Sequence, residues 1–268
     1  MKILVLGDCQ SNGNNCLSDE IIGDNLPRTW SLRYHNNFSQ VFKWYLTQRK
    51  KHNIQDPINT ENVQSATWAY IRKRELEIAW PSFLRGDITN RSLNGAHFIG
   101  YHKRLLQYIN SVGLPDRVLV TDYTFSHHVS SFKHNNKQYV FEKNPYYSDA
   151  EWNPNDYPVE VHQMLKEKLA FQLAQPREWH IRRHTKAYQQ LVKVLKHYNL
   201  KWTVVRFGDP EKQNIGVFDK IMGTDIDCID IFNQYRVNND EYGTPKLNCQ
   251  VEIAKRVQNY LDNIQEHS

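Results

Sequence analysis

The chain of 268 residues lacks the sequence signals of several protein classes. No run of apolar residues approaches the length that spans a bilayer, which argues against a membrane protein. The four cysteines form no CxxC pair, and no histidine stands at zinc-finger spacing, so a structural zinc site is not indicated. The order of regions that marks a signal peptide is also absent. We therefore expect a reduced, cytoplasmic protein.

Phosphate-binding loops are missing as well. Neither GxGxxG nor the GxxxxGK spacing occurs, so the common nucleotide-binding motifs give no support for a nucleotide cofactor. The net charge is +5, but the basic residues are scattered, with "QRKKH" and "IRRH" the densest clusters. In a nucleic-acid-binding protein, the basic residues gather on one face or one helix, so we expect no nucleic-acid partner. Because the nucleotide-binding motifs are missing, we also expect no cofactor.

What is present is the pattern of an α/β protein. Hydrophobic residues make up 40% and charged residues 24%, which is typical of a globular chain. The apolar runs "KILVLG", "RVLVTDYTF" and "WTVVRFG" predict buried parallel strands, and "DCIDIF" predicts a weaker one. Helical periodicity predicts helices over 97–113, 179–200 and 249–264.

The alternation of strands and helices predicts one doubly wound, mostly parallel α/β domain of flavodoxin-like, three-layer type over residues 1–268. Two stretches, about 19–79 and about 126–176, show no clear period and are predicted to be long insertions. In such a sheet, ligands bind beyond the carboxyl ends of the strands. The segments that follow the strands are therefore the first places to look for a site.

Those segments together resemble the SGNH (GDSL-type) hydrolases. "ILVLGDCQSNG" resembles the first block, "NRSLNGAHF" the second, "RVLVTDYTFS" the third, and "EYGTPKLNCQVEIAKRV" the last. The segment "AWPSFLRGD" resembles a phage-borne subgroup, so the cytoplasm would be that of the host cell if the chain is phage-encoded. The resemblance implies an SGNH fold and ester hydrolysis. It puts Cys9 at the nucleophile position and makes Gly95 an oxyanion donor.

The remaining positions of the resemblance depart from the family's catalytic set. The third block puts Thr124 where an Asn is expected, and the last block puts Glu241 and Thr244 in place of Asp and His. Threonine accepts no proton near neutral pH, so the triad that the resemblance implies is broken. His127 or His128, directly after the third strand, could supply a base, as could His97. The alternative is that these are loop histidines that hydrogen-bond to the backbone.

Other polar residues near the strand ends also have two interpretations. Cys9 is either a thiolate activated at a strand-to-helix turn or a small buried packing residue. Ser11 and Asn12 are either site residues or helix caps. Acidic residues at strand ends either bind a hard cation or cap helices. These are Asp8, Asp122, Asp209, Asp225, Asp227 and Asp230.

Two classes of function follow from the residues and the resemblance. The protein is either an esterase that acts on an acyl ester or acetylated glycan, or a catalytically degenerate binding or phage-associated structural protein. The second insertion carries aromatic residues suited to a sugar or to a protein partner. They are Tyr139, Tyr146, Tyr147, Trp152 and Tyr157.

Overall fold

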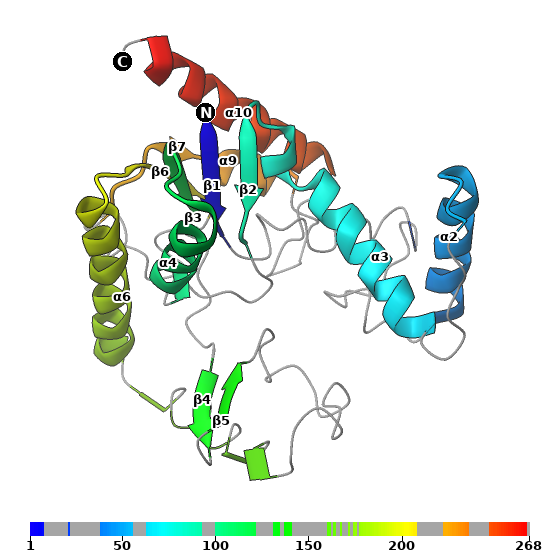
Figure 1. Ribbon diagram of the computed structural model, residues 1–268, viewed down its shortest axis with the longest axis horizontal. Coiled ribbons are helices and arrows are strands. Elements are labelled where there is room, and N and C mark those ends of the chain that lie inside the picture. Colours follow the sequence, from blue (N-terminus) through cyan, green and yellow to red (C-terminus); the bar gives the residue numbers. More distant parts are fainter. Residues whose placement is uncertain are drawn as a thin grey trace. The chain divides into compact units, whose positions relative to one another are not determined.

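A computed structural model gives the three-dimensional structure of the chain (Figure 1). It describes residues 1–7, 21, 38–55, 63–92, 100–121, 131–134, 137–140, 177–207, 222–235 and 247–266, with a few single positions between 160 and 175. The chain divides into two compact units, each of which is discontinuous in sequence. Unit 1 comprises Met1–Cys9 and Gly86–Ile229, and unit 2 comprises Gln10–Arg85 and Asp230–Ser268. The prediction of a single domain over the whole chain stays a prediction.

Unit 1 is built on a parallel sheet of five strands in the order β2-β1-β3-β6-β7. The strands are β1 (Lys2–Leu6), β2 (Asp87–Asn90), β3 (Arg117–Thr121), β6 (Lys201–Arg206) and β7 (Ile226–Asp227). Every pairing in this sheet is parallel, and β1 lies between β2 and β3 (Figure 1). Helices flank the sheet, and the predicted doubly wound α/β fold is confirmed.

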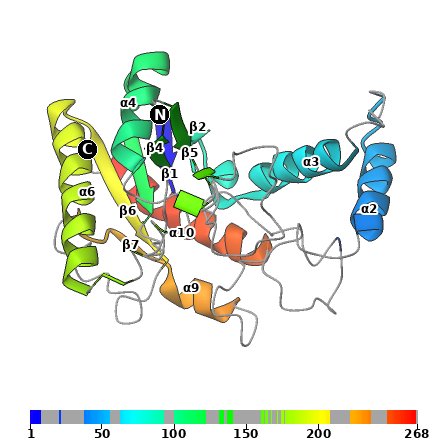
Figure 2. The ribbon, with the colours of Figure 1, turned by 90° about the horizontal axis from the view of Figure 1, so that it is seen from below.

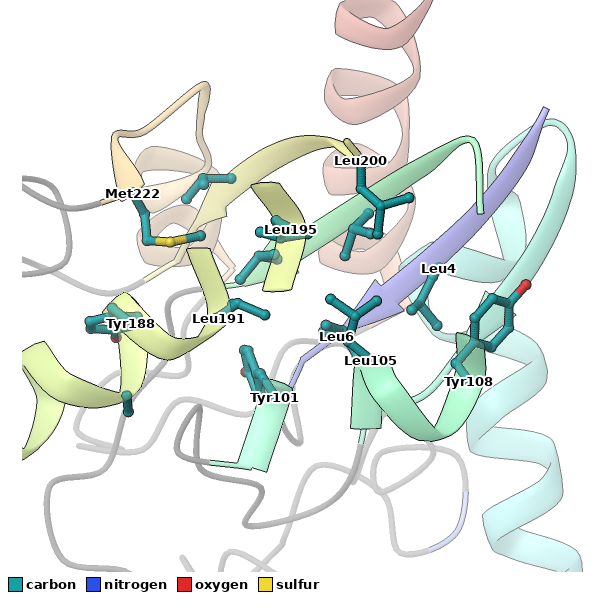
Figure 3. Packing of buried hydrophobic residues seen from close by; sticks show 14 residues of the cluster. Leu4, Leu6, Tyr101, Leu105, Tyr108, Tyr188, Leu191, Leu195, Leu200 and Met222 are labelled. Atoms are coloured by element: carbon teal, nitrogen blue, oxygen red, sulfur yellow. The ribbon is translucent and has the colours of Figure 1, made fainter. Parts of the chain in front are cut away.

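The core of unit 1 lies between one face of the sheet and two helices, α4 (Tyr101–Val112) and α6 (Arg177–His197). Leu4 and Leu6 point from β1 towards the buried side chains of both helices (Figure 3). α4 and α6 also contact one another and run along the sheet (Figure 2). On the opposite face of β1, β3 and β6, the side chains of Ile3, Val5, Leu119 and Val205 are equally buried. Strands buried on both faces explain why their sequences are continuous apolar runs without alternation.

The predicted helices of this unit are confirmed, and so is one of their ends. α4 ends before Gly113, whose N–H donates to the carbonyl of Ile109 at 3.0 Å and whose φ of 108° lies in the region that favours glycine. α6 ends at His197 and leads within a few residues to β6, as the crossover pattern predicts. The buried positions of α4 include the tyrosines Tyr101 and Tyr108 as well as Leu105.

The prediction of a strand over "DCIDIF" is wrong for most of its length. Only Ile226 and Asp227 pair with β6, and the chain then forms the helix α9 (Ile229–Gln234). The Asp227 carboxylate accepts a hydrogen bond from the N–H of Ile229 at 2.9 Å, which satisfies one of the free donors at the start of that helix. Asp227 thus ends β7 and also accepts a backbone N–H at the start of α9.

Unit 2 contains the first predicted insertion, whose described residues are largely helical although the sequence shows no clear period there. It holds the helices α2 (Phe38–Lys51) and α3 (Val63–Ile78), which pack together through Val41 and Ile71 with Trp44 and Trp68 beside them. The 3-10 turn η3 (Trp80–Phe83) follows and contacts α10 (Leu247–Glu266), the predicted C-terminal helix. The helical periodicity of α2 and α3 is hard to recognise in the sequence, because aromatic and long polar side chains make much of their packing.

The second predicted insertion contains an antiparallel hairpin, β4 (Ser131–His134) and β5 (Lys137–Val140). Phe132 stands opposite Tyr139 in its register. The other aromatic residues singled out in this insertion, Tyr146, Tyr147, Trp152 and Tyr157, lie outside the described residues.

Candidate functional site

The strand order places a topological switch point at the centre of the sheet. From β1 the chain adds β2 on one side, and it then crosses over through α4 to add β3 on the other side. In doubly wound sheets, ligands bind beyond the carboxyl ends of the strands at such a switch point, which here lies between β1 and β3. The order β2-β1-β3-β6-β7 is the flavodoxin-like arrangement to which this rule applies.

The carboxyl ends of β1, β2, β3 and β6 lie along one edge of the sheet. The last register pairs on either side of β1 are Val5 with Asn90 and Leu6 with Val120. Thr121, the last residue of β3, pairs with Val205 of β6. The segments that follow β1, β2 and β3 therefore begin side by side, and these are the segments to which the resemblance assigns the first three blocks.

All seven predicted site residues lie outside the described part of the chain. They are Cys9, Gly95, Thr124, His127, His128, Glu241 and Thr244. Asp8, Ser11, Asn12, His97, Asp122 and Asp209 lie outside it too. The described chain ends two residues before Cys9 at Gly7, and three residues before Gly95 at Ser92. The roles predicted for these residues stay predictions, and what the structure gives is the frame from which their loops start.

Arg104 joins two parts of that frame. Its Nη1 donates to the carbonyl oxygen of Gly7 at 3.3 Å and to the carbonyl oxygen of Arg91 at 2.5 Å. Gly7 follows β1 and Arg91 follows β2, so one nitrogen atom of α4 holds the backbone beyond both strands. Hydrogen bonds from a charged donor are stronger than those between neutral groups, which favours a well-defined position for the two carbonyls.

Tyr101 extends the same contact to β3. The guanidinium carbon of Arg104 lies over the Tyr101 ring, 4.7 Å from its centroid, which is within the range of a cation–π interaction. The Tyr101 hydroxyl donates to the carbonyl oxygen of Thr121 at 3.3 Å, and the side chain is fully buried. Two residues of the first turn of α4 thus contact the ends of three neighbouring strands. We call Tyr101 and Arg104 the α4 brace.

The α4 brace is not evident in the amino-acid sequence. Tyr101 and Arg104 stand three residues apart, so they share one face of a helix, and both were read only as parts of a helix pattern. Their partners at Gly7 and Thr121 are 97 and 20 residues away in the chain. The available signal was a tyrosine and an arginine one turn apart at the start of a crossover helix.

Ser92 is a second polar feature at the end of β2. Its backbone N–H donates to the Asn90 side-chain oxygen at 3.0 Å, an Asx turn that ends the strand. The side chain is 4% exposed, and its hydroxyl oxygen has no hydrogen-bond partner in the described part of the structure. Buried hydroxyls usually have a partner, so Ser92 marks an unusual position three residues before Gly95.

The acids of "GTDIDCID" are held by groups of the protein. Asp225 accepts a hydrogen bond from the N–H of Val204 at 2.7 Å, and Asp227 accepts one from Ile229. Asp230 pairs with Arg256, which donates to both of its carboxylate oxygens, and this contact lowers the pKa of the carboxyl. Among the described residues, no group of three or more His, Cys, Asp or Glu side chains is placed to bind a metal. These acids therefore have structural roles in their own units.

Two of the four cysteines are described, and both are buried thiols. Cys228 follows β7, and Cys249 lies in α10. Burial raises the pKa of the Cys249 thiol to about 12. A thiol with so high a pKa is almost wholly protonated near neutral pH and is a poor nucleophile. Cys249 is therefore an internal reference for an unreactive cysteine in this protein.

Comparison with known proteins finds no family model, no curated protein and no solved structure that matches this chain. None of the described helices is both long and apolar enough to cross a membrane.

Proposed function

We propose that this chain is an SGNH-like protein that binds an acyl ester, such as an acetylated glycan, beyond the carboxyl edge of its sheet. In this proposal Cys9 occupies the nucleophile position and Gly95 the oxyanion position. The observation that carries it is the register of β1, β2 and β3, whose neighbouring ends begin the segments to which the resemblance assigns the first three blocks. Such a switch point is where ligands bind in doubly wound sheets.

The chemistry proposed at this site depends on a base. A thiol attacks an ester carbonyl as the thiolate, and a neighbouring histidine is the usual proton acceptor. Because Thr244 replaces the histidine of the last block, His127 or His128 would have to supply that base. We therefore expect weak turnover of short-chain esters at most, and iodoacetamide should modify Cys9 no faster than a free thiol at neutral pH.

A second function is favoured by the same replacement. With threonine at position 244 and no asparagine in the third block, the crevice can bind an ester without cleaving it. The protein would then be a catalytically degenerate binding protein or a structural component of a phage assembly. The aromatic second insertion would contact a sugar or a protein partner.

Hydrolysis of p-nitrophenyl acetate and binding of an acetylated oligosaccharide, compared between the wild type and Cys9→Ala, test the proposal. Weak or absent turnover with retained binding supports the degenerate binding protein. Robust turnover that Cys9→Ala abolishes supports a thiol esterase. Changing Cys249 to Ala is the matched control, because its buried thiol has a raised pKa and takes no part in the proposed site. If the wild type neither binds nor cleaves any ester, the proposal is wrong.

A further inference from the structure

The α4 brace contacts backbone at the very ends of three strands. Thr121 is the last paired residue of β3, the N–H of Arg91 still donates to the Val5 carbonyl, and Gly7 follows the last pair of β1. The register of the sheet ends at Val5 with Asn90 and at Leu6 with Val120. Gly7 lies beyond the last of these pairs, and its carbonyl is held by Arg104. The direction in which the chain leaves β1 therefore depends on a side chain of α4 as well as on the sheet.

The chemistry of the contact requires arginine. Nη1 of a guanidinium carries two N–H groups in fixed directions, so one nitrogen can donate to two carbonyl oxygens at the same time. The flat group can also lie over an aromatic ring, as the guanidinium carbon does here over Tyr101. Lysine keeps the charge but has neither the planar group nor the same directions of donation. A lysine at position 104 would therefore not reproduce the contact.

The brace lies next to the segments of the proposed site. Gly7 is two residues before Cys9, and Arg91 is four residues before Gly95. The carbonyl of Thr121, held by Tyr101, is three residues before Thr124. The three segments that the resemblance assigns to the nucleophile, the oxyanion donor and the third block thus all leave the sheet from backbone held by one turn of α4.

We propose that Tyr101 and Arg104 are positioning residues, which hold the ends of β1, β2 and β3 so that the loops carrying Cys9 and Gly95 keep their relative placement. The inference rests on the proposed function for the role of those loops. The contacts that carry it are in the described structure. Removing the brace takes away the hydrogen bonds that hold the Gly7 and Arg91 carbonyls, and backbone that loses fixed contacts opens locally at lower free energy.

Arg117 provides a matched control near the amino ends of the strands of the same sheet. Its Nη1 donates to the Thr203 hydroxyl at 2.7 Å and to the carbonyl oxygen of Trp202 at 3.5 Å. It is half-buried and joins β3 to β6 near their amino ends. Arg117→Gln thus removes an arginine that also bridges two strands. This arginine lies at the end of the strands opposite to the proposed site.

The experiment measures the rate at which iodoacetamide modifies Cys9 in the folded, full-length protein, followed by mass spectrometry. Wild type, Arg104→Gln, Arg104→Lys, Tyr101→Phe and Arg117→Gln are compared, with modification of Cys249 recorded as the internal reference and stability measured by urea unfolding. Arg104→Gln should raise the Cys9 rate by about fivefold, an order-of-magnitude estimate for local opening. Arg104→Lys should not restore the wild-type rate, and Tyr101→Phe should give a smaller change in the same direction.

Arg117→Gln should leave the Cys9 rate within about twofold of the wild type even where its loss of stability equals that of Arg104→Gln. If the Cys9 rate follows overall stability equally in the two glutamine variants, the brace is a general stabilising contact and the proposal is overturned. Should Arg104→Gln not fold, an unchanged Cys9 rate in Tyr101→Phe and Arg104→Lys would overturn it as well. The alkylation readout needs no ester, so a failure of the proposed function is recognised separately, by the absence of ester binding in the wild type.

Discussion

Gly86 lies directly against the backbone of Met1. A Cβ atom at position 86 would stand 2.8 Å from the Met1 carbonyl oxygen, and the φ angle of Gly86 is 126°. The same oxygen accepts the N–H of Asp87 at 3.1 Å at the start of β2. The close approach of two backbones at the amino edge of the sheet therefore requires glycine.

We expect Gly86→Ala to lower the free energy of unfolding by about 2–4 kcal/mol, since it combines a positive φ with a clash against backbone. Gly113→Ala serves as one control, because its φ is 108° but nothing lies within 4 Å of its Cβ position, so only the backbone strain remains. Gly100→Ala is a second control, with a φ of −89° and open space. Urea unfolding should rank the losses as Gly86, then Gly113, then Gly100. Equal losses at Gly86 and Gly113 would show that the clash with Met1 is relieved.

The contact between Trp80 and Gln250 gives a second prediction. The Gln250 side-chain oxygen accepts the N–H of Trp80 at 2.7 Å, and both residues are fully buried. Gln250→Met keeps the length of the side chain but leaves a buried N–H without this partner, which should cost about 1–3 kcal/mol of stability. Gln258→Met is the matched control, because Gln258 accepts the N–H of Arg85 at 2.8 Å at an exposed position. Water can replace that bond, so the control should lose less than about 1 kcal/mol in urea unfolding.

Stability should fall at alkaline pH in a way that depends on Cys249. Burial raises the pKa of its thiol from 9.0 to about 12, so between these values the folded state holds a proton that the unfolded state has lost. Stability is therefore full below about pH 9 and decreases as the pH rises, by up to about 1.4 kcal/mol per pH unit for one group. Urea unfolding at pH 8, 9 and 10 in the presence of reductant should show a shallower decrease for Cys249→Ala than for the wild type. Parallel curves would contradict a buried, protonated thiol.

The ion pair between Asp230 and Arg256 should contribute little. Arg256 lowers the pKa of Asp230 from 3.8 by donating to its carboxylate, so the pair stabilises the fold above about that pH and loses its effect as the pH falls through the folded pKa. The Asp230 side chain is 66% exposed, and solvent screening limits the coupling to about 0.2–1 kcal/mol. A double-mutant cycle with Asp230→Asn and Arg256→Gln should give this value at pH 7 in low salt and a smaller one in 1 M NaCl. A coupling well above this range would show that the pair is shielded from solvent.

Much of the local structure could be predicted because its causes are local. Continuous runs of β-branched and apolar residues are stable as strands buried on both faces, and three such runs occur, "KILVLG", "RVLVT" and "WTVVR". The helix that ends at Gly113 is determined by its periodicity and by a residue that tolerates positive φ. The "DCIDIF" prediction failed after Asp227, where the chain forms α9 and the Asp227 carboxylate accepts the N–H of Ile229. Hydrophobic periodicity does not reveal a side-chain contact of this kind.

The order of the strands and the contacts at their carboxyl ends were decided only by the tertiary structure. The amino-acid sequence shows which segments follow β1, β2 and β3, and hence which residues are candidates for a site. It did not determine that Arg104 would meet Gly7, 97 residues earlier, or that Tyr101 would meet Thr121. Such contacts depend on the register of parallel strands and on the place where α4 packs against them. Both result from burying the same apolar faces together, which no single segment specifies.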